Sequence, residues 1–344
     1  MNMQIYSHLK SNLHDSYSFD IADGLCITEG ELVKARLGHD AVLLKIDNIK
    51  NFIESFENLK EIKTVTRNRY AISILNGIYK NQYLYGYKSM DVSAQAGLIL
   101  NPRELDLRIF FRHWAYIFYI EDSERGDSLQ IFDNEGNAVH KIYPTLNTDI
   151  AFFKSIKNKY KSELKEIIFE KHPSFFPDGE ITFNKQIDDD WRKMSDVHDF
   201  YMLMHKYKMD RFSLLKSVKP DLACQVDNGI IERVFTKTKE MLNEIVIFVS
   251  NKGCVQIFTG IPDKIFYKDD WLNIFNNNFK LHIKYNQIHS SWIVRKPCEN
   301  GYVNSLEAYA EDGTLIIQIY GQRNEGEKER ELWREVISIS KCNW

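Results

Sequence analysis

The chain has 344 residues, of which 44% are hydrophobic and 27% are charged, and its formal net charge is −3 at pH 7. This length predicts two domains with a large buried core. The charge balance provides no basic field, so nucleic acid and anionic lipid are not expected as partners. Residues 1–10 lack a basic patch followed by an apolar run, and apolar stretches such as 245–250 are too short to span a bilayer. We therefore expect a cytoplasmic protein without membrane insertion.

The cysteines are scattered, odd in number and without a CxxC pair. This usage favours reduced thiols over a zinc site or a disulfide framework. The residues are Cys26, Cys224, Cys254, Cys298 and Cys342.

Each half of the chain opens with a helical pattern. Thr28-Glu-Gly-Glu31 has the spacing of a capping box and predicts a helix start. Its counterpart in the second half is Asp210-Arg-Phe-Ser-Leu-Leu215, which follows a helix expected over Trp191–Lys208.

A repeat then links the two halves. Leu59–Asn68 resembles Leu242–Asn251 at an offset of 183 (Leu59 to Leu242), and Leu107–Phe111 resembles Leu281–Tyr285 at 174 (Leu107 to Leu281). Asn134–Tyr143 resembles Glu311–Tyr320 at 177 (Tyr143 to Tyr320), each being a glycine turn before an alternating strand. The order of the segments is the same in both halves.

The repeat predicts an α+β fold, because helices precede a meander of antiparallel strands in each half. We expect a first repeat over 1–170, a linker over 171–190 and a second repeat over 191–344. The linker contains two prolines, a Pro-Asp-Gly turn and the run Asp188–Asp190. That run is a candidate cation site, but a solvated helix start is the favoured interpretation.

The common catalytic signatures are absent. The sequence contains no GxGxxG, GxxxxGK[ST], HExxH or GxSxG motif. The sequence therefore does not support assignment to the dinucleotide-binding proteins, the P-loop ATPases, the zincins or the α/β hydrolases.

Several residues stand out as candidates for ligand binding. His198 lies where Ser195-Asp-Val-His198 opens a helix, with Val197, Tyr201, Met204 and Lys208 on one stripe and Ser195 or Asp196 as the cap. Lys296 and Arg323 lie at the ends of predicted strands. Their cations either bind carboxylates of a ligand or are surface charges on an edge strand. Arg108 interrupts the apolar alternation of 105–111, so it either pairs inside the protein or faces a ligand.

Long strings of the sequence resemble the HemS/ChuS/HmuS family of haem-utilisation proteins, also called hemin-degrading factors. The strings are Gly97–Arg108, Trp191–Phe200, Asp221–Asn228, Glu244–Gly260, Trp271–Asn276, Arg295–Pro297 and Gln318–Gly326. The resemblance implies a tandem duplication in which each half has helices and part of a large antiparallel sheet. It also implies that haem b occupies a cleft between sheet and helices.

The same resemblance implies roles for individual residues. His198, in the Asp-Val-His motif, corresponds to the axial ligand of the haem iron, and Arg108 to a distal arginine with Phe110 beside it. His198 and Arg108 are thus the candidate catalytic pair. Further haem contacts are expected at Arg211, Val246, Phe248, Lys296, Gln318, Tyr320 and Arg323. The stretch 83–96 is longer than usual for the family and lacks the histidine often found there.

Two functions remain open at this point. One is an enzyme that opens the porphyrin ring and frees iron after haem uptake, using an external reductant supplied by a partner such as a reductase. The other is a haem chaperone or store that receives haem from an import transporter and passes it on. An interaction protein that does not bind haem is the third and least favoured interpretation.

Overall fold

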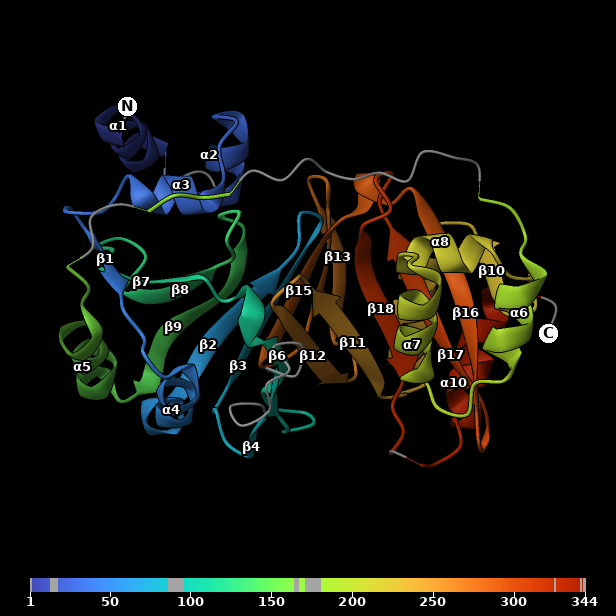
Figure 1. The fold of residues 1–344 in the computed structure, drawn as a ribbon. Coiled ribbons are helices and arrows are strands. Elements are labelled where there is room, and N and C mark those ends of the chain that lie inside the picture. Colours follow the sequence, from blue (N-terminus) through green and yellow to red (C-terminus); the bar gives the residue numbers. More distant parts are fainter. Residues whose placement is uncertain are drawn as a thin grey trace. The chain divides into compact units, whose positions relative to one another are not determined.

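The computed structural model describes residues 2–12, 18–85, 96–163, 167–170, 181–324, 326–340 and 342 (Figure 1). The chain forms two compact units that do not coincide with simple halves. The first contains Met1–Arg67, Ile74–Ser174 and Asn251–Gln256, and the second contains Asn68–Ser73, Phe175–Ser250 and Ile257–Trp344. The expected boundaries at 170 and 190 stay a prediction, since residues 171–180 of the expected linker lie outside the described residues.

The first unit begins with helices and continues with strands. Its helices are α1 (Asn2–Asn12), α2 (Ser18–Gly24), α3 (Glu29–Lys34), α4 (Ile49–Glu54) and α5 (Ile150–Tyr160), with short 3-10 turns at Ser55–Leu59 and Phe111–His113. Its strands are β1 (Ala41–Leu44), β2 (Lys60–Arg67), β4 (Gln82–Tyr85), β5 (Ala96–Ile99), β6 (Asp106–Phe110), β7 (Tyr116–Ile120), β8 (Ser128–Phe132) and β9 (Ala138–Thr148). Antiparallel pairing gives the strand orders β1-β7-β8-β9-β2 and β4-β5-β6.

The second unit repeats this plan. Its helices are α6 (Lys185–Arg192), α7 (Asp199–Tyr207), α8 (Arg211–Lys216), α9 (Ile230–Glu240) and α10 (Glu331–Ile337), with 3-10 turns at Tyr285–Gln287 and Ser338–Ser340. Its strands are β10 (Ala223–Val226), β11 (Ile245–Ser250), β13 (Lys264–Lys268), β14 (Trp271–Phe275), β15 (Phe279–Lys284), β16 (Ser290–Cys298), β17 (Gly301–Tyr309) and β18 (Leu315–Gly321). Antiparallel pairing gives β10-β16-β17-β18-β11 and β13-β14-β15.

Two further strands, β3 (Ala71–Gly77) and β12 (Cys254–Gly260), each span a boundary between the units' segments. The observed architecture confirms the α+β class and the tandem repeat of helices followed by a large antiparallel sheet. Among the described residues, no helix is both long and apolar enough to cross a lipid bilayer.

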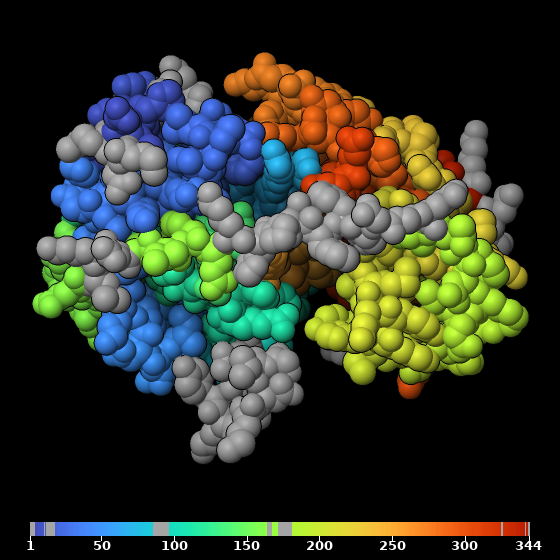
Figure 2. All heavy atoms as spheres, turned by 45° about the horizontal axis from the view of Figure 1, so that its top comes forward, coloured from blue at the N-terminus to red at the C-terminus, as the bar shows by residue number. Residues whose placement is uncertain are grey.

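In each unit a helical layer covers the sheet. In the second unit, helices α6, α7 and α8 pack on β10, β16 and β17 (Figure 1), and their yellow-green outer surface is visible in Figure 2. Trp191, Phe200 and Leu214 from the helices meet Val294 and Tyr309 from the strands in one buried cluster. In the first unit, Val33 of α3 packs against β1, β7 and β8 in the same way. The apolar face of each helical layer is thus removed from water, which is the main stabilising contribution.

Two asparagines that the repeat aligns each stabilise a turn between strands, one in each copy. Asn68 Oδ1 accepts the backbone N–H groups of Tyr70 and Ala71, at 2.9 and 2.8 Å. Asn251 Oδ1 accepts those of Gly253 and Cys254, both at 2.9 Å. These Asx turns reverse the chain at the predicted asparagines of the repeat. The predicted hairpins β8-β9 and β17-β18 are also confirmed.

The predicted helix starts are confirmed as well. Thr28 caps α3 and forms the reciprocal capping box with Glu31. Asp210 caps α8, since its side chain accepts the backbone N–H of Ser213.

The helix expected over Trp191–Lys208 is divided. Helix α6 ends at Arg192 and α7 begins at Asp199, with His198 as its N-cap residue. The expected stripe is wrong, because α7 buries Phe200 and Leu203 while Tyr201 is 54% exposed. A break of a few residues rotates the helix face, and no local periodicity reports that rotation.

The aspartate run lies within helix α6, with Asp188 in its first turn. Asp188 accepts the side chain of Arg192 and the backbone N–H of Lys219, and Asp190 accepts Lys206 and Tyr207. Across the described residues, no group of three or more His, Cys, Asp or Glu side chains is placed to hold a metal ion. Asp189 accepts a hydrogen bond from Lys185 at 2.6 Å, so protein donors already occupy all three carboxylates.

The expectation that all cysteines are reduced thiols is wrong for one pair. The sulfurs of Cys224, on β10, and Cys342, after the last 3-10 turn, form a disulfide, with Cα atoms 6.4 Å apart. The two residues are 118 positions apart, so no local spacing in the sequence predicts their pairing. Cys26, Cys254 and Cys298 are free.

A buried polar network lies inside the first unit. His140 is 1% exposed, and its Nδ1 and Nε2 lie 2.8 and 2.7 Å from the hydroxyl oxygens of Thr66 and Tyr79. Trp114 stacks against the imidazole. Burial lowers the pKa of His140 from 6.5 to about 3, so the ring is neutral at physiological pH.

This network predicts a pH-dependent stability. The unfolded chain takes up a proton at His140 below pH 6.5, but the folded chain does so only near pH 3, so the free energy of unfolding falls as pH falls through this window. One such group contributes about 1.4 kcal/mol per pH unit. Urea unfolding between pH 7 and 5 should show a smaller slope for His140→Asn than for the wild type. The exposed His289→Asn serves as control, and equal slopes for all three proteins would contradict the assignment.

Candidate functional site

His198 lies in a short connection that is held by hydrogen bonds on both sides. The backbone N–H of Glu299, in the turn between β16 and β17, donates to the carbonyl of Ser195 at 2.9 Å. Asp199, the first residue of α7, accepts the backbone N–H groups of Ser195 and Asp196 at 2.9 and 3.0 Å. Neither predicted cap residue caps α7; instead, the helix's own Asp199 stabilises the turn before it. The connection is therefore anchored to the strands below.

Asp196 sets the orientation of the His198 ring. Its Oδ1 accepts the His198 backbone N–H at 2.7 Å and lies 2.5 Å from His198 Nδ1. The His198 backbone N–H is the largest cause that lowers the pKa of Asp196, so this carboxyl is ionised and can only accept. Nδ1 is therefore the protonated nitrogen of the neutral tautomer, in which the lone pair is at Nε2. The side chain is 81% exposed.

Most of the other predicted contact residues lie on one face of the second unit's sheet. Val246 and Phe248 of β11 stand directly opposite Tyr320 and Gln318 of β18. These side chains are half-buried, and the rings of Phe248 and Tyr320 meet edge to face with centroids 5.4 Å apart. The sheet thus offers an apolar strip beside a polar strip.

Glu307, on β17, is the centre of a buried polar cluster that sequence reasoning missed. Its carboxylate is fully buried and accepts Arg211 of α8 in a bidentate pair, at 2.7 and 2.8 Å. Lys296 Nζ lies 3.3 Å from Oε1, and Gln318 Nε2 donates to the same oxygen at 3.0 Å. The remaining donors are the hydroxyls of Ser305, at 2.8 Å, and Tyr309, at 2.5 Å.

The charges in this cluster stabilise one another. Burial raises the pKa of Glu307, but the positive charges of Arg211 and Lys296 outweigh it and hold that pKa well below its usual value. Two cations and one anion leave a net charge of +1 in a site where Lys296 is only 2% exposed. Such a cluster favours an anionic ligand group. Strand β16 lies between β10 and β17, so Lys296 is not on an edge strand, and its burial rules out a surface charge.

Phe200 connects the cluster with the helix that follows His198. Its ring centroid lies 4.6 Å from the guanidinium of Arg211 and 5.1 Å from Lys296 Nζ. Aromatic faces attract cations at these distances. The cluster and His198 are thus joined through α7.

Glu307 had a detectable signal in the sequence. Glu307 stands between Leu306 and Ala308 in the middle of β17, so a charged residue interrupts an apolar stretch of a strand. The same pattern drew attention to Arg108. The partner of such a residue cannot be found in this way, because Arg211 is 96 positions away in the sequence.

The remaining predicted residues are not among the hydrogen-bond partners of Glu307. Arg108 and Phe110 are half-buried residues of β6 in the first unit, and Arg108 donates to Asp106 and to the carbonyl of Leu107. Arg323 follows β18 and donates to the carbonyls of Asn324 and Glu327. Residues 86–95 of the unusual 83–96 stretch lie outside the described residues.

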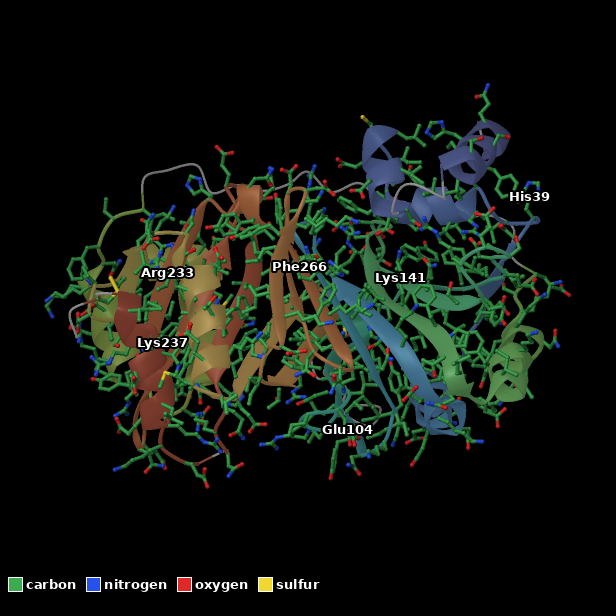
Figure 3. All side chains as sticks on the ribbon, turned by 180° about the vertical axis from the view of Figure 1, so that it is seen from behind. His39, Glu104, Lys141, Arg233, Lys237 and Phe266 are labelled. Carbon is green, nitrogen blue, oxygen red and sulfur yellow. A yellow bond between two sulfur atoms is a disulfide. The ribbon has the colours of Figure 1, made fainter. Side chains whose placement is uncertain are left out.

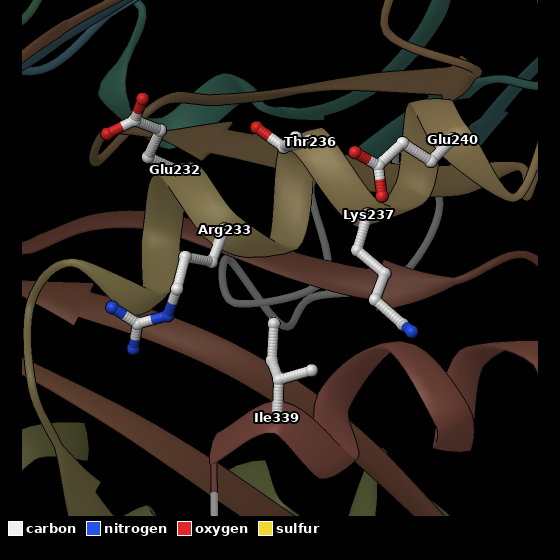
Figure 4. A pocket seen from close by; sticks show the side chains of 6 residues that line it. All are labelled: Glu232, Arg233, Thr236, Lys237, Glu240 and Ile339. Atoms are coloured by element: carbon white, nitrogen blue, oxygen red, sulfur yellow. The ribbon is translucent and has the colours of Figure 1, made fainter.

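Two hollows on the second unit's surface are lined by residues other than the predicted ones. One, of about 390 Å³, lies between α9 and the 3-10 turn near Ile339 (Figure 4), with Arg233 and Lys237 pointing from α9 (Figures 3 and 4). Lys237 is paired with Glu335 at 3.6 Å. Another, of about 540 Å³, is lined by Arg69, Tyr70, Gln287, Glu311 and Asp312. Charged residues make up most of both linings.

Comparison with known proteins gives matches over nearly the whole chain. Residues 26–160 and 208–339 each match the model of the haemin-degrading HemS.ChuX domain. The chain is 39% identical over 337 residues to the hemin transport protein HemS of Yersinia enterocolitica, covering 97% of this chain and 95% of the relative. It is 38% identical over 346 residues to the hemin transport protein HmuS of Yersinia pestis, covering 97% and 96%.

Solved structures agree with these matches. The heme degrading enzyme ChuS of Escherichia coli O157:H7 superposes with a TM-score of 0.90 at 38% identity, covering 99% of both chains. Holo-PhuS, a heme-binding protein from Pseudomonas aeruginosa, superposes with a TM-score of 0.90 at 30% identity over the full length of both chains.

The buried cluster predicts unequal effects of two arginine substitutions. Arg211→Ala leaves the Glu307 carboxylate without its bidentate partner, and we expect a loss of about 3–5 kcal/mol in the free energy of unfolding. Arg233→Ala removes an exposed pair with Asp227, for which about 0–1 kcal/mol is expected. Urea unfolding measures both, and similar losses would show that the Glu307 pair is not special.

Proposed function

Because this chain belongs to the HemS/ChuX family of haemin-degrading proteins, we propose that it binds haem with His198 as the axial ligand of the iron. The observation that supports this role is the bond between His198 Nδ1 and Asp196, which leaves an exposed Nε2. A carboxylate on the far ring nitrogen is the usual arrangement of a metal-binding histidine, since it fixes the tautomer and the ring orientation.

The sheet face of the second unit fits the rest of the ligand. Val246 and Phe248 provide apolar contact area for a porphyrin, and Gln318, Tyr320 and the cations behind them provide donors for its propionates. Haem here is the bound substrate or cargo, so these residues bind and orient it. Arg323 stays a predicted propionate contact.

We propose that the bound haem is degraded and its iron released. Ring opening needs an oxidant and electrons, and the sequence contains no dinucleotide fingerprint. An external reductant, delivered by a partner such as a reductase, therefore belongs to the proposal. Support comes from the 38% identical ChuS, which is described as a heme degrading enzyme. Arg108 is proposed as the distal residue, which donates hydrogen bonds to the reacting ligand of the iron.

A second function, haem delivery, is favoured by a different observation. The Yersinia relatives are named hemin transport proteins, and PhuS is described as heme-binding. An exposed axial histidine also suits a protein that passes its cargo on. In either case the proposal places the protein in the cytoplasm, downstream of a haem importer.

The first test is the ligand itself. Purified wild-type protein mixed with haemin should show a Soret band that shifts in His198→Ala, because the axial nitrogen is lost. His205→Ala, on the exposed side of the same helix, is the matched control and should leave the band unchanged. An unshifted band in His198→Ala would remove His198 as the ligand.

The second test separates degradation from delivery. Ascorbate or an NAD(P)H-dependent reductase is added to the haem complex, with and without catalase, and Soret loss and the tetrapyrrole product are followed. A defined product in the presence of catalase is expected, and Arg108→Ala should slow its formation by about 100-fold, the effect of one removed donor. The exposed Arg112→Ala is the control. Stable haem under all conditions would instead support delivery.

A further inference from the structure

The antiparallel sheet β13-β14-β15 has one face that takes no part in the proposed haem binding. Side chains alternate along its strands, and Leu272, Ile274 and Leu281 on one side are fully buried. The opposite side, which we call the aromatic-basic face, has β14 in its centre and Phe266 of the edge strand β13 (labelled in Figure 3). From one end to the other, its cross-strand rows are Lys264, Phe275 and Lys280; Phe266, Asn273 and His282; and Lys268, Trp271 and Lys284.

Four lysines border the aromatic-basic face, and none of the side chains in its rows is acidic. Lys264, Lys268 and Lys280 are exposed. The carboxylates nearest in sequence lie beyond the strand ends, at Asp263 and at 269–270. The net charge of −3 is a sum over the whole chain, so it does not report this local excess of positive charge, which attracts a polyanion.

The rings of this face lie beside its cations. Lys284 Nζ lies 5.3 Å from the centroid of the Trp271 ring, and Lys280 Nζ lies 5.6 Å from that of Phe275. Phe266, which is 39% exposed, meets Phe275 edge to face with centroids 5.1 Å apart. A single strand of nucleic acid has the matching groups, because its bases stack on aromatic rings while its phosphates attract nearby ammonium groups.

His282 adds a hydrogen-bond acceptor in the middle row of the face. Asn273 Nδ2 donates to the carbonyls of Trp271 and Phe266, at 3.0 and 3.4 Å. Its Oδ1 is therefore the acceptor in the contact with His282 Nδ1, at 2.6 Å. Burial, aided by the charge of Lys280, lowers the pKa of His282 to about 4, so the ring is neutral with its proton on Nδ1. Nε2 is then an acceptor, which suits the amino groups of bases and the 2′-hydroxyl of RNA.

The fold does not require these side chains, because the first unit has others in their place. At the repeat offset of 174, Arg108 occupies the position of His282. Strand β5 pairs Ala96 and Leu98 with β6, so the central strand of that sheet has aliphatic side chains where β14 has Trp271 and an amide. The combination of rings and lysines is therefore particular to the second unit and indicates a ligand of its own.

We propose that the aromatic-basic face binds a single strand of nucleic acid, with bases on Trp271 and Phe275, phosphates at the lysines, and a base amino group or ribose hydroxyl at His282. A duplex does not fit in this way, because its bases are stacked inside the helix and their faces cannot reach the rings. The expectation of no nucleic-acid partner rested on the net charge, and the arrangement of charges on this face replaces it. The proposal is independent of haem binding.

The test measures the binding of a fluorescently labelled C-rich RNA of about 12 nucleotides by anisotropy over a range of KCl concentrations. With four lysines engaged, log Kd should rise with log salt with a slope of about 3 for the wild type and about 1.4 for Lys264→Gln/Lys268→Gln. Trp271→Ala should weaken binding by about tenfold through the loss of one stacked base. Lys154→Gln/Lys159→Gln, at exposed positions of α5, makes the same charge change and should behave like the wild type.

Other outcomes overturn the proposal. It is wrong if the wild type does not bind the RNA, or if it binds a duplex of the same length equally well. It is also wrong if the α5 variant loses as much affinity as the β13 variant, since any exposed lysine would then suffice. A second haemin that displaces the RNA and is lost in His282→Ala would assign the face to haem instead.

Two controls keep the test decisive. The lysines of β13 are exposed, so their double variant should melt like the wild type even if Trp271→Ala does not fold. The same double variant should titrate with haemin like the wild type, because it leaves the proposed haem contacts unchanged. A failure of this inference is thereby distinguished from a failure of the proposed haem function.

Discussion

The structure of the second unit depends on a fully buried carboxylate. Burying Glu307 without partners would cost several kcal/mol, so the fold has to bring donors to it. They come from helix α8 and from strands β16, β17 and β18. Satisfying this one group therefore fixes the helical layer on the sheet and the side-chain positions of three neighbouring strands. The same donors make up the polar part of the candidate site, so the requirement for stability and the requirement for binding act on the same residues.

The first unit shows that the repeat keeps the backbone and changes the charges. At the offset of 177, Gln130 takes the position of Glu307 and Ser128 that of Ser305. A buried carboxylate of this unit, Glu29 on helix α3, pairs with Lys141 on β9. Burial raises the pKa of Glu29, but the positive charges of Lys141 and Arg67 have the larger effect, so the pKa lies below its usual value. The two copies of one fold thus place a buried, paired anion on a strand in the second unit and on a helix in the first.

The geometry of His198 illustrates how a local motif gains meaning from its setting. Asp196 contacts both the backbone N–H and the ring of His198, and this contact is local because the two residues are two positions apart. The direction in which the ring is presented depends on the break between α6 and α7 and on the bond between Glu299 and Ser195. Phe200 then places the cations of the cluster under the same helix. An orienting carboxylate, an exposed nitrogen and a nearby anion-binding cluster together suit a flat metal chelate with carboxylate groups.

Local chemistry in the sequence was enough for the turns at Asn68 and Asn251, the capping box at Thr28, the cap at Asp210 and the repeat of helices followed by strands. These features depend on contacts within a few residues, so pattern and spacing report them directly. The resemblance of long strings also identified the family, and with it the candidate residues. Only the tertiary structure decided which residues meet. The pair of Arg211 and Glu307 spans 96 positions, the disulfide of Cys224 and Cys342 spans 118, and the buried face of α7 follows from a helix break. Such contacts are set by the packing of distant segments, and no local spacing encodes them.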